Sequence, residues 1–373
     1  MAKPLFPLAR AIALSAAATC LVAGALGAHG AAPRPQPAWD AAAAARYLDT
    51  RLEWWRHWPK AARDHDTQCI SCHTALPHVL GEQALRPGNA PRSAPENAMY
   101  DDVTKRVWLW RETEPFYTDQ VQGMPKSSES RSVEAVLNAL FLATRDQERG
   151  LFGTDTRTAF DHMWAIQSRN AANAGGFPWL NFHLEPWESP SATYWGATLA
   201  AIAVARAPAS YRDDPAVVPH VEALRGYLRS GLPSATLYTS ALILIADAAI
   251  HGVLDPAQRD AIVTALVSAQ EPDGGWPLPS LAPWERVDKT PLPTDTDGYA
   301  TAIAALALRE AGTPAAAAPL AKAKAWLIAH QDRKTGAIPA KSINKDRKPD
   351  TDAYLFMTDH ATGIAAMVLR PAS

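Results

Sequence analysis

Two cysteines and a histidine lie together in the run Cys69-Ile70-Ser71-Cys72-His73. Cysteines at this spacing can each form a thioether to a vinyl group of haem, and the histidine that follows them is placed to bind the iron. The alternatives are a disulfide or redox dithiol pair, and half of a zinc site. A zinc site needs further thiolates, and the chain has only one more cysteine, Cys20. The run therefore predicts one covalently bound haem c with His73 as a ligand of the iron.

The first 32 residues have the features of a secretory signal. Lys3 and Arg10 are the only charged residues before an apolar, alanine-rich run from Ala11 to Ala28, and small residues near its end offer a cleavage site. Removal of residues 1–32, together with Cys20, would leave one domain over residues 33–373 with no stable membrane span. Because haem attachment of this kind takes place outside the cytoplasm, the predicted location is a bacterial periplasm.

The composition argues against a polyanionic partner. The 373 residues are 47% hydrophobic and carry a formal net charge of only -2. A nearly neutral chain has no general attraction for nucleic acid. The expected partner is a redox protein or a small-molecule substrate.

Helical periodicity dominates the chain after residue 38, and the expected helices come in pairs. The first helix of each pair carries charge on one face; the ranges are Trp39–His57, Glu96–Glu112, Arg157–Arg169, Val217–Arg229, Pro256–Gln270 and Ala315–Gln331. The second is apolar or small on almost all sides, as a helix buried all round must be; the ranges are Cys72–Leu85, Ser132–Arg145, Thr193–Ala205, Leu237–Ile250, Gly298–Arg309 and Asp359–Leu369. This alternation predicts an all-α (α/α)6 toroid with the buried helices inside. The haem would be built into the first hairpin, with a haem-binding segment at about residues 60–130.

Three segments repeat one pattern, in which a helix ends in Gln and a glycine-containing turn follows. The segments are Trp164…Gln167 with Gly175-Gly176-Phe177-Pro178 and Pro186-Trp187-Glu188, Leu266…Gln270 with Gly274-Gly275-Trp276-Pro277 and Pro283-Trp284-Glu285, and Trp326…Gln331 with Gly336-Ala337-Ile338-Pro339. The glycines suit left-handed turn conformations, and the prolines prevent the helix from continuing.

The Gln…Gly-Gly-Trp pattern resembles the QW-type repeat of the terpenoid cyclase and protein prenyltransferase superfamily, squalene–hopene cyclases in particular. The resemblance covers roughly residues 130–370 and implies an α/α toroid with a central cavity. Residues Cys69–Pro77 and 130–140 also resemble exported proteins in which a haem-binding C-x-x-C-H-T is joined to such a toroid. That second resemblance implies no particular reaction.

Cyclase chemistry by protonation needs a strong carboxylic acid in a D-x-D-D cluster at the cavity. The nearest match is Asp295-Thr296-Asp297-Gly298, in which glycine replaces the last acid. A prenyltransferase-type zinc could use Asp297 and His360, but no cysteine remains free to join them. Helix capping is the simpler role for Asp295 and Asp297, and also for Asp359. Cyclase activity is therefore not expected.

Two residues are candidates for the second axial position of the iron. All inner helices of a toroid run the same way, so their N-terminal ends share one face. Met124, in the loop Gln122–Lys126, and His360, at the expected start of the last inner helix, would both lie near His73. A Gly-Met-Pro loop resembles the methionine loop of small c-type cytochromes. Met124 is preferred, and His360 is the alternative.

Other side chains near the motif have two interpretations each. Arg131 and Lys126 could pair with haem propionates or could be solvated. Trp54, Trp55 and Trp58 could form a wall of a haem pocket or could serve only to pack helices together.

The leading functional hypothesis is a single-haem electron-transfer cytochrome, with Met124 closing the sixth position and the toroid as a scaffold. A second is a haem oxidoreductase, peroxidase-like or oxygenase-like, with an organic substrate in the toroid cavity; Glu134, Asp297 and Asp359 would be polar groups at its mouth. A third is a non-redox binding module descended from cyclases, in which haem is structural or sensory.

Overall fold

The computed structural model describes residues 38–86, 90–115 and 123–371, without the side chains of residues 123–125. Within these ranges, twelve long helices form an outer and an inner set. The outer helices are α1 (Ala41–His57), α3 (Ala94–Trp108), α5 (Thr154–Ile166), α8 (Val218–Ser230), α10 (Pro256–Ser268) and α13 (Pro314–Ala329). The inner helices are α2 (Ala75–Leu85), α4 (Gly123–Glu148), α6 (Ala192–Arg206), α9 (Leu237–Ile250), α12 (Gly298–Ala311) and α14 (Phe356–Leu369).

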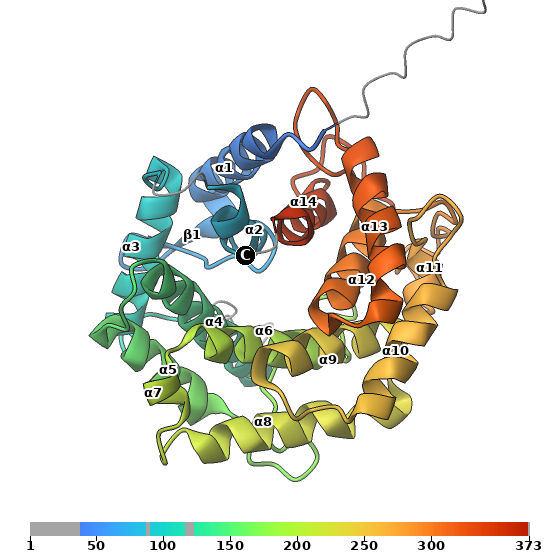
Figure 1. Ribbon diagram of the computed structural model, residues 1–373. Coiled ribbons are helices and arrows are strands. Elements are labelled where there is room, and N and C mark those ends of the chain that lie inside the picture. Colours follow the sequence, from blue (N-terminus) through green and yellow to red (C-terminus); the bar gives the residue numbers. More distant parts are fainter. Residues whose placement is uncertain (1–37, 87–89, 116–122, 372–373) are drawn as a thin grey trace, which may run out of the picture. The chain divides into compact units, whose positions relative to one another are not determined.

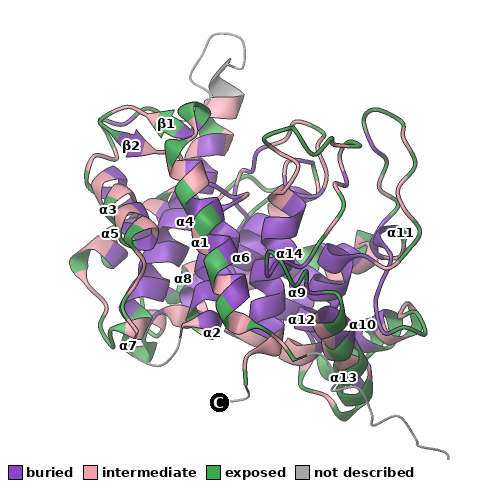
Figure 2. Cartoon of the chain, turned by 90° about the horizontal axis from the view of Figure 1, so that it is seen from above, coloured by how far each residue is buried: buried purple, intermediate pink, exposed green. Residues whose placement is uncertain are grey.

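The inner helices form a closed ring. Each packs against the next in the order α2, α4, α6, α9, α12 and α14, and α14 packs back on α2 (Figure 1). Burial follows the same division, because the inner helices are buried along nearly their whole length while the outer ones keep an exposed face (Figure 2). The predicted all-α toroid is confirmed for the described residues.

Short elements complete the described chain. They are the helices α7 (Ala209–Arg212) and α11 (Leu278–Leu281), the 3-10 turns Pro59–Ala61 and Leu232–Ser234, and an antiparallel pair of two-residue strands, β1 (Ala62–Arg63) and β2 (Thr67–Gln68). Strands of two residues are too short to show alternation, so sequence patterns do not predict them. None of the helices in the described part combines the length and apolar character needed to cross a bilayer.

Several helix starts differ from the expected ones, and those of α4 and α2 affect the predicted site residues. Helix α4 begins at Gly123, well ahead of the predicted Ser132, and so includes a polar segment that was expected to be a loop. Pro125 is compatible with this because it falls in the first turn, where a helix needs no N–H donor. Helix α2 begins at Ala75, so Cys72 and His73 precede it.

The repeated glutamines join neighbouring hairpins. In each repeat the side-chain amide donates to the glycine carbonyl of its own turn and to a carbonyl near the start of the next outer helix, always at 2.9 Å. The sets are Gln167 with Gly175 and His220, Gln270 with Gly274 and Pro319, and Gln331 with Gly336 and Asp40. Because Asp40 caps α1, the last set connects the end of the ring to its beginning.

The turn glycines are required by both conformation and space. Gly336 has a φ of +84°, and a Cβ built on it would lie 2.3 Å from the carbonyl carbon of Ala43 in α1. The corresponding glycines, Gly175 and Gly274, have φ values of +90° and +96° and face the backbone of the next outer helix in the same way. A side chain at these positions would separate adjacent hairpins.

We expect Gly336→Ala to lower the free energy of unfolding by more than about 2 kcal/mol, because a positive φ and a backbone clash act together. Gly312→Ala is the matched control, since Gly312 also has a positive φ (+61°) but has no atom within 4 Å of the built Cβ. The control should lose only about 1 kcal/mol. Urea unfolding of both variants measures the difference; equal losses would mean that contact with α1 does not restrict this turn.

Candidate functional site

A cavity of about 260 Å³ opens at the end of the ring where the inner helices begin. Cys69, Cys72 and His73 all line it. Much of the remaining wall is aromatic or aliphatic and includes Trp55, Trp58, Val133, Leu180, Leu184, Trp187 and Phe356. The C-x-x-C-H run therefore faces one mainly apolar cavity.

The backbone of the motif is fixed by hydrogen bonds on both sides. The N–H of Cys69 donates to Ala61 at 2.7 Å, and the indole N–H of Trp55 donates to the Cys69 carbonyl at 2.9 Å. The hydroxyl of Ser71 accepts from the backbone N–H groups of His73 and Thr74 at 3.0 and 2.8 Å. The middle of the motif thus forms its own turn ahead of α2.

Helix α14 holds the other side of this turn through Asp359. Its carboxylate, which is fully buried, accepts from the hydroxyl of Tyr47 at 2.6 Å and from that of Thr74 at 3.1 Å, and it forms an ion pair with Arg51 at 2.9 Å. The prediction that Asp359 caps a helix is wrong, because α14 begins at Phe356 and Asp359 lies one turn inside it. It joins α1, α14 and the residue after His73 instead of facing the cavity.

His360 also contacts the motif, through a hydrogen bond to its backbone. Its Nε2 donates to the carbonyl oxygen of Cys72 at 2.7 Å, and its ring stacks on Trp187 with 3.9 Å between centroids. Burial lowers the pKa of His360 to about 3, so the ring is neutral. Nε2 is thus engaged by the motif backbone, and the assignment of His360 as the second axial ligand stays a prediction.

Met124, the preferred second ligand, lies in the first turn of α4, and its side chain is outside the described part of the structure. Its assignment as a ligand stays a prediction. The expectation that its backbone forms a loop is corrected by the helical start at Gly123.

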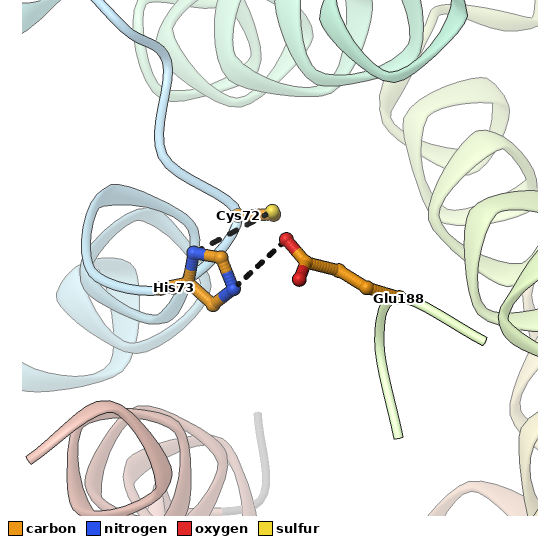
Figure 3. A group of neighbouring side chains, drawn as sticks. All are labelled: Cys72, His73 and Glu188. Atoms are coloured by element: carbon orange, nitrogen blue, oxygen red, sulfur yellow. Dashed lines mark hydrogen bonds and ion pairs between the residues drawn. The ribbon is translucent and has the colours of Figure 1, made fainter. Parts of the chain in front are cut away.

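The side chain that faces His73 is Glu188, which is not one of the site residues predicted from the sequence. Its Oε1 lies 3.5 Å from His73 Nε2, and Cys72 Sγ lies 3.9 Å from His73 Nδ1 (Figure 3). Ligand atoms of Cys72, His73 and Glu188 all lie within 4.8 Å of one another, close enough to hold a metal ion. The available signal was the repeated Pro-Trp-Glu, which had been interpreted only as part of a structural repeat.

The charge states of these groups suit some chemistries better than others. Burial lowers the pKa of His73, against the opposing effect of Glu188, and leaves a neutral imidazole able to bind a metal. Burial raises the pKa of Cys69 to about 11, and burial together with Glu188 raises that of Cys72 further above its usual value. Redox dithiols need a lowered thiol pKa, so a thiol–disulfide function is not favoured.

Charged residues around the cavity differ in part from the expected set. Glu134 lines it, as proposed, but is paired with Arg106 at 2.6 Å. Arg131 lies over the ring of Trp110, and Lys126 pairs with Glu129. Besides Arg106, the arginines that line the cavity are Arg63 and Arg347.

Of the tryptophans before the motif, two line the cavity and the third packs against one of them. Trp55 and Trp58 line the cavity, and Trp54 stacks on Trp58 at 5.4 Å. On the opposite wall, the indole N–H of Trp187 donates to the hydroxyl of Tyr299 at 3.1 Å, which pairs with that of Tyr238 at 2.8 Å. These buried rings fill the space next to Trp187.

The acids proposed for cyclase chemistry lie elsewhere. Asp297 caps α12, as predicted, by accepting from the N–H groups of Tyr299 and Ala300, and it also accepts from Lys341 N–H at 2.8 Å. Burial raises the pKa of Asp297 to about 6. Asp295 and Asp297 line a different cavity of about 470 Å³, which does not include His73.

A second cluster, Asp49, His78 and Glu82, lies on α1 and α2. His78 Nε2 is 2.9 Å from Asp49 Oδ1 and 3.7 Å from Glu82 Oε2. Arg86, one turn further along α2, lies 3.4 Å from Glu82 and 2.6 Å from Glu96. The alternating charges make this cluster an ion-pair network between helices.

Comparison with known proteins gives similarity in fold at low sequence identity. No family model matches the chain, and no curated protein matches it. A variant of the type II terpene cyclase MstE from Scytonema, in complex with merosterolic acid A, is 16% identical with a TM-score of 0.49, over 88% of this chain and 98% of that one. A glycosidase variant is 11% identical with a TM-score of 0.48, over 88% and 96%. ent-Copalyl diphosphate synthase from Streptomyces platensis is 17% identical with a TM-score of 0.43, over 88% and 65%.

The leading hypothesis, an electron-transfer cytochrome, is corrected by these findings. The similar solved structures named above include terpene cyclases and a glycosidase, and the likeness concerns the fold alone.

We expect Asp359→Ala to cost about 3–5 kcal/mol of unfolding free energy, because it leaves the buried guanidinium of Arg51 without its partner. Glu222→Ala, which removes a largely exposed partner of Arg225, is the control and should leave stability almost unchanged. Guanidinium unfolding measures both. A small loss for Asp359→Ala would show that Arg51 finds water instead.

The Asp49–His78 pair predicts a specific pH dependence. Burial disfavours the charged ring, but the hydrogen bond to Asp49 and the nearby glutamates outweigh it and raise the pKa of His78. The stabilisation is complete below the unfolded-state pKa of about 6.5 and is lost as the pH rises through the folded-state value. The free energy of unfolding should therefore fall above about pH 6.5.

His78→Gln should remove that fall, which unfolding curves at a series of pH values would reveal. Histidines with a lowered pKa, such as His220, instead lower the free energy of unfolding as the pH falls below about 6.5. They therefore do not contribute to a fall on the alkaline side. A variant with the same alkaline slope as the wild type would contradict the assignment.

Proposed function

We propose that this protein is a non-redox binding module descended from cyclases, in which a toroid holds one covalent haem c at Cys69 and Cys72 and binds a small molecule beside it. The observation that carries the proposal is that both thiols and the imidazole of His73 line one mainly apolar cavity. Export to a periplasm, directed by residues 1–32, belongs to the proposal; those residues lie outside the described part of the chain.

The residues present fit a haem of this kind. Cys69 and Cys72 are free cysteines, and their raised pKa values keep them as neutral thiols until they react. His73 has a neutral ring. Haem bound at Cys69 and Cys72 would supply an iron that binds small molecules, and the imidazole of His73 would hold that iron.

The side chains that line the cavity would contribute apolar surface and positive charge to haem binding. Trp55, Trp58 and Phe356 provide apolar surface that excludes water, and Phe356 stacks on the ring of His73 at 4.7 Å and fixes its orientation. Arg63 and Arg347 present guanidinium groups to the cavity and are the candidates to bind carboxylates such as haem propionates. Arg106 is less suitable because Glu134 already neutralises it.

Binding is favoured over cyclase chemistry by the position of the acids. Asp297 accepts three backbone N–H groups at a separate cavity, and Asp359 is held in the ion pair with Arg51. The carboxylates that do line the His73 cavity include Glu134, paired with Arg106, and Glu188.

The test is to produce the full chain in a bacterium that attaches haem c, and to purify it from the periplasm. The wild type should keep haem on a denaturing gel, with the matching increase in intact mass, and the double variant Cys69→Ala/Cys72→Ala should lose it. Glu222→Ala, far from the motif, should keep it. The reduced protein should bind carbon monoxide, because the proposed function has a small molecule bind next to the haem.

Two results would contradict the proposal. Zinc or another ion in place of haem, found by elemental analysis, would make the cysteine–histidine motif a simple metal site. Rapid, reversible electron exchange between the haem and a soluble cytochrome would contradict the non-redox function.

A further inference from the structure

We propose that Glu188 is the second protein ligand of the metal centre that His73 holds. The identity of that metal as haem iron rests on the function proposed above, but the assignment of Glu188 does not. The assignment of Glu188 rests on the geometry of the cavity, and it requires neither Met124 nor His360.

The spacing of the two side chains suits one metal ion between them. Typical distances from zinc to an imidazole nitrogen and to a carboxylate oxygen are each about 2.1 Å, so two ligands on opposite sides of an ion lie about 4 Å apart. His73 Nε2 and Glu188 Oε1 are 3.5 Å apart and point toward each other (Figure 3). A shift of roughly half an ångström would admit the ion.

Both side chains are held where they are. The backbone of Glu188 exchanges hydrogen bonds with Leu184 at 2.9 and 3.0 Å, and its carbonyl also accepts from Phe182 N–H at 2.8 Å. On the other side, the ring of His73 stacks on Phe356 and meets the edge of Trp187. The opposition of imidazole and carboxylate is thus built by three separate segments of the toroid, namely the loop 182–188, the motif and the start of α14.

The other glutamates of this region have different partners. Glu134 is paired with Arg106, and Glu185 accepts from the hydroxyl of Ser189 at 2.7 Å. The carboxylate of Glu188, by contrast, pairs with His73 itself. A metal ion between them would give a ligand bond to each.

A carboxylate in this position would determine what the centre binds. An anionic oxygen is a displaceable ligand for haem iron, and its negative charge disfavours the approach of other anions. The preferred ligand class is therefore a small neutral molecule, such as carbon monoxide, rather than an anion such as azide.

The experiment compares the haem-loaded wild type with Glu188→Ala and Glu188→Gln. Glu188→Ala should change the ferric optical and electron paramagnetic resonance spectra and should bind azide at least tenfold more tightly; Glu188→Gln should lie between it and the wild type. Glu285→Ala is the matched control, because Glu285 ends the equivalent Pro-Trp-Glu of the next repeat, is exposed and pairs with Lys289 at 3.2 Å. It should behave as the wild type.

Unchanged spectra and azide affinity in a folded Glu188→Ala protein would overturn the inference while the haem proposal stands. If the wild type carries no haem, the wild type, Glu188→Ala and His73→Ala are titrated with Co²⁺. A loss of at least tenfold in Co²⁺ affinity for both Glu188→Ala and His73→Ala would support Glu188 as a ligand and reject haem. Co²⁺ affinity that is unaffected by Glu188→Ala, or no Co²⁺ binding by the wild type, would overturn the inference.

Discussion

The structure depends on a contact between the last inner helix and the first. Neighbouring residues of α14, Asp359 and His360, bind Thr74 and the carbonyl of Cys72, at the turn that leads into α2. The same carboxylate holds Arg51 of α1 in a buried ion pair. Such a pair is costly to break from one side, so closure of the ring and the conformation of the cysteine–histidine motif are one constraint. A toroid that opened between α14 and α2 would lose its functional motif at the same time.

That constraint explains why the site lies where it does. A motif at the start of an inner helix faces the loops that lead into the other inner helices, and the loop before α6 supplies Trp187 and Glu188. The tryptophan closes one side of the cavity through its hydrogen bond to Tyr299. The glutamate faces His73 from the same loop. Closure of the ring thus brings together residues that lie more than a hundred positions apart in the sequence.

Much of this fold could be predicted from the sequence, because alternation of amphipathic and wholly apolar helices is a strong local signal. The repeats also indicated real contacts, as the parallel hydrogen bonds of Gln167 and Gln331 show. The functional site was harder to predict than the fold. The start of α14 was expected one turn too late, since helix boundaries are the weakest part of sequence-based prediction. His360 meets the carbonyl of Cys72, a tertiary contact that helical periodicity does not predict. Glu188 carries no local signal for metal binding, because its partner is brought to it only by the tertiary fold. The electron-transfer hypothesis failed for a related reason: a cofactor motif indicates a group that can be held, not the reaction that the surrounding fold permits.

The two Pro-Trp-Glu segments show how a repeat can be used for different purposes. Trp187 and Trp284 occupy equivalent positions and approach the same tyrosine pair, with Trp187 on Tyr299 at 5.6 Å and Trp284 on Tyr238 at 5.1 Å. Packing is therefore conserved between the two copies, while the next residue is free to differ in role. Glu285 is exposed and pairs with Lys289, whereas Glu188 faces His73 in the cavity. Because the tryptophan carries the packing, the glutamate that follows it can serve a ligand site without disturbing the ring. A binding function could in this way arise at one hairpin of a toroid whose architecture all hairpins share.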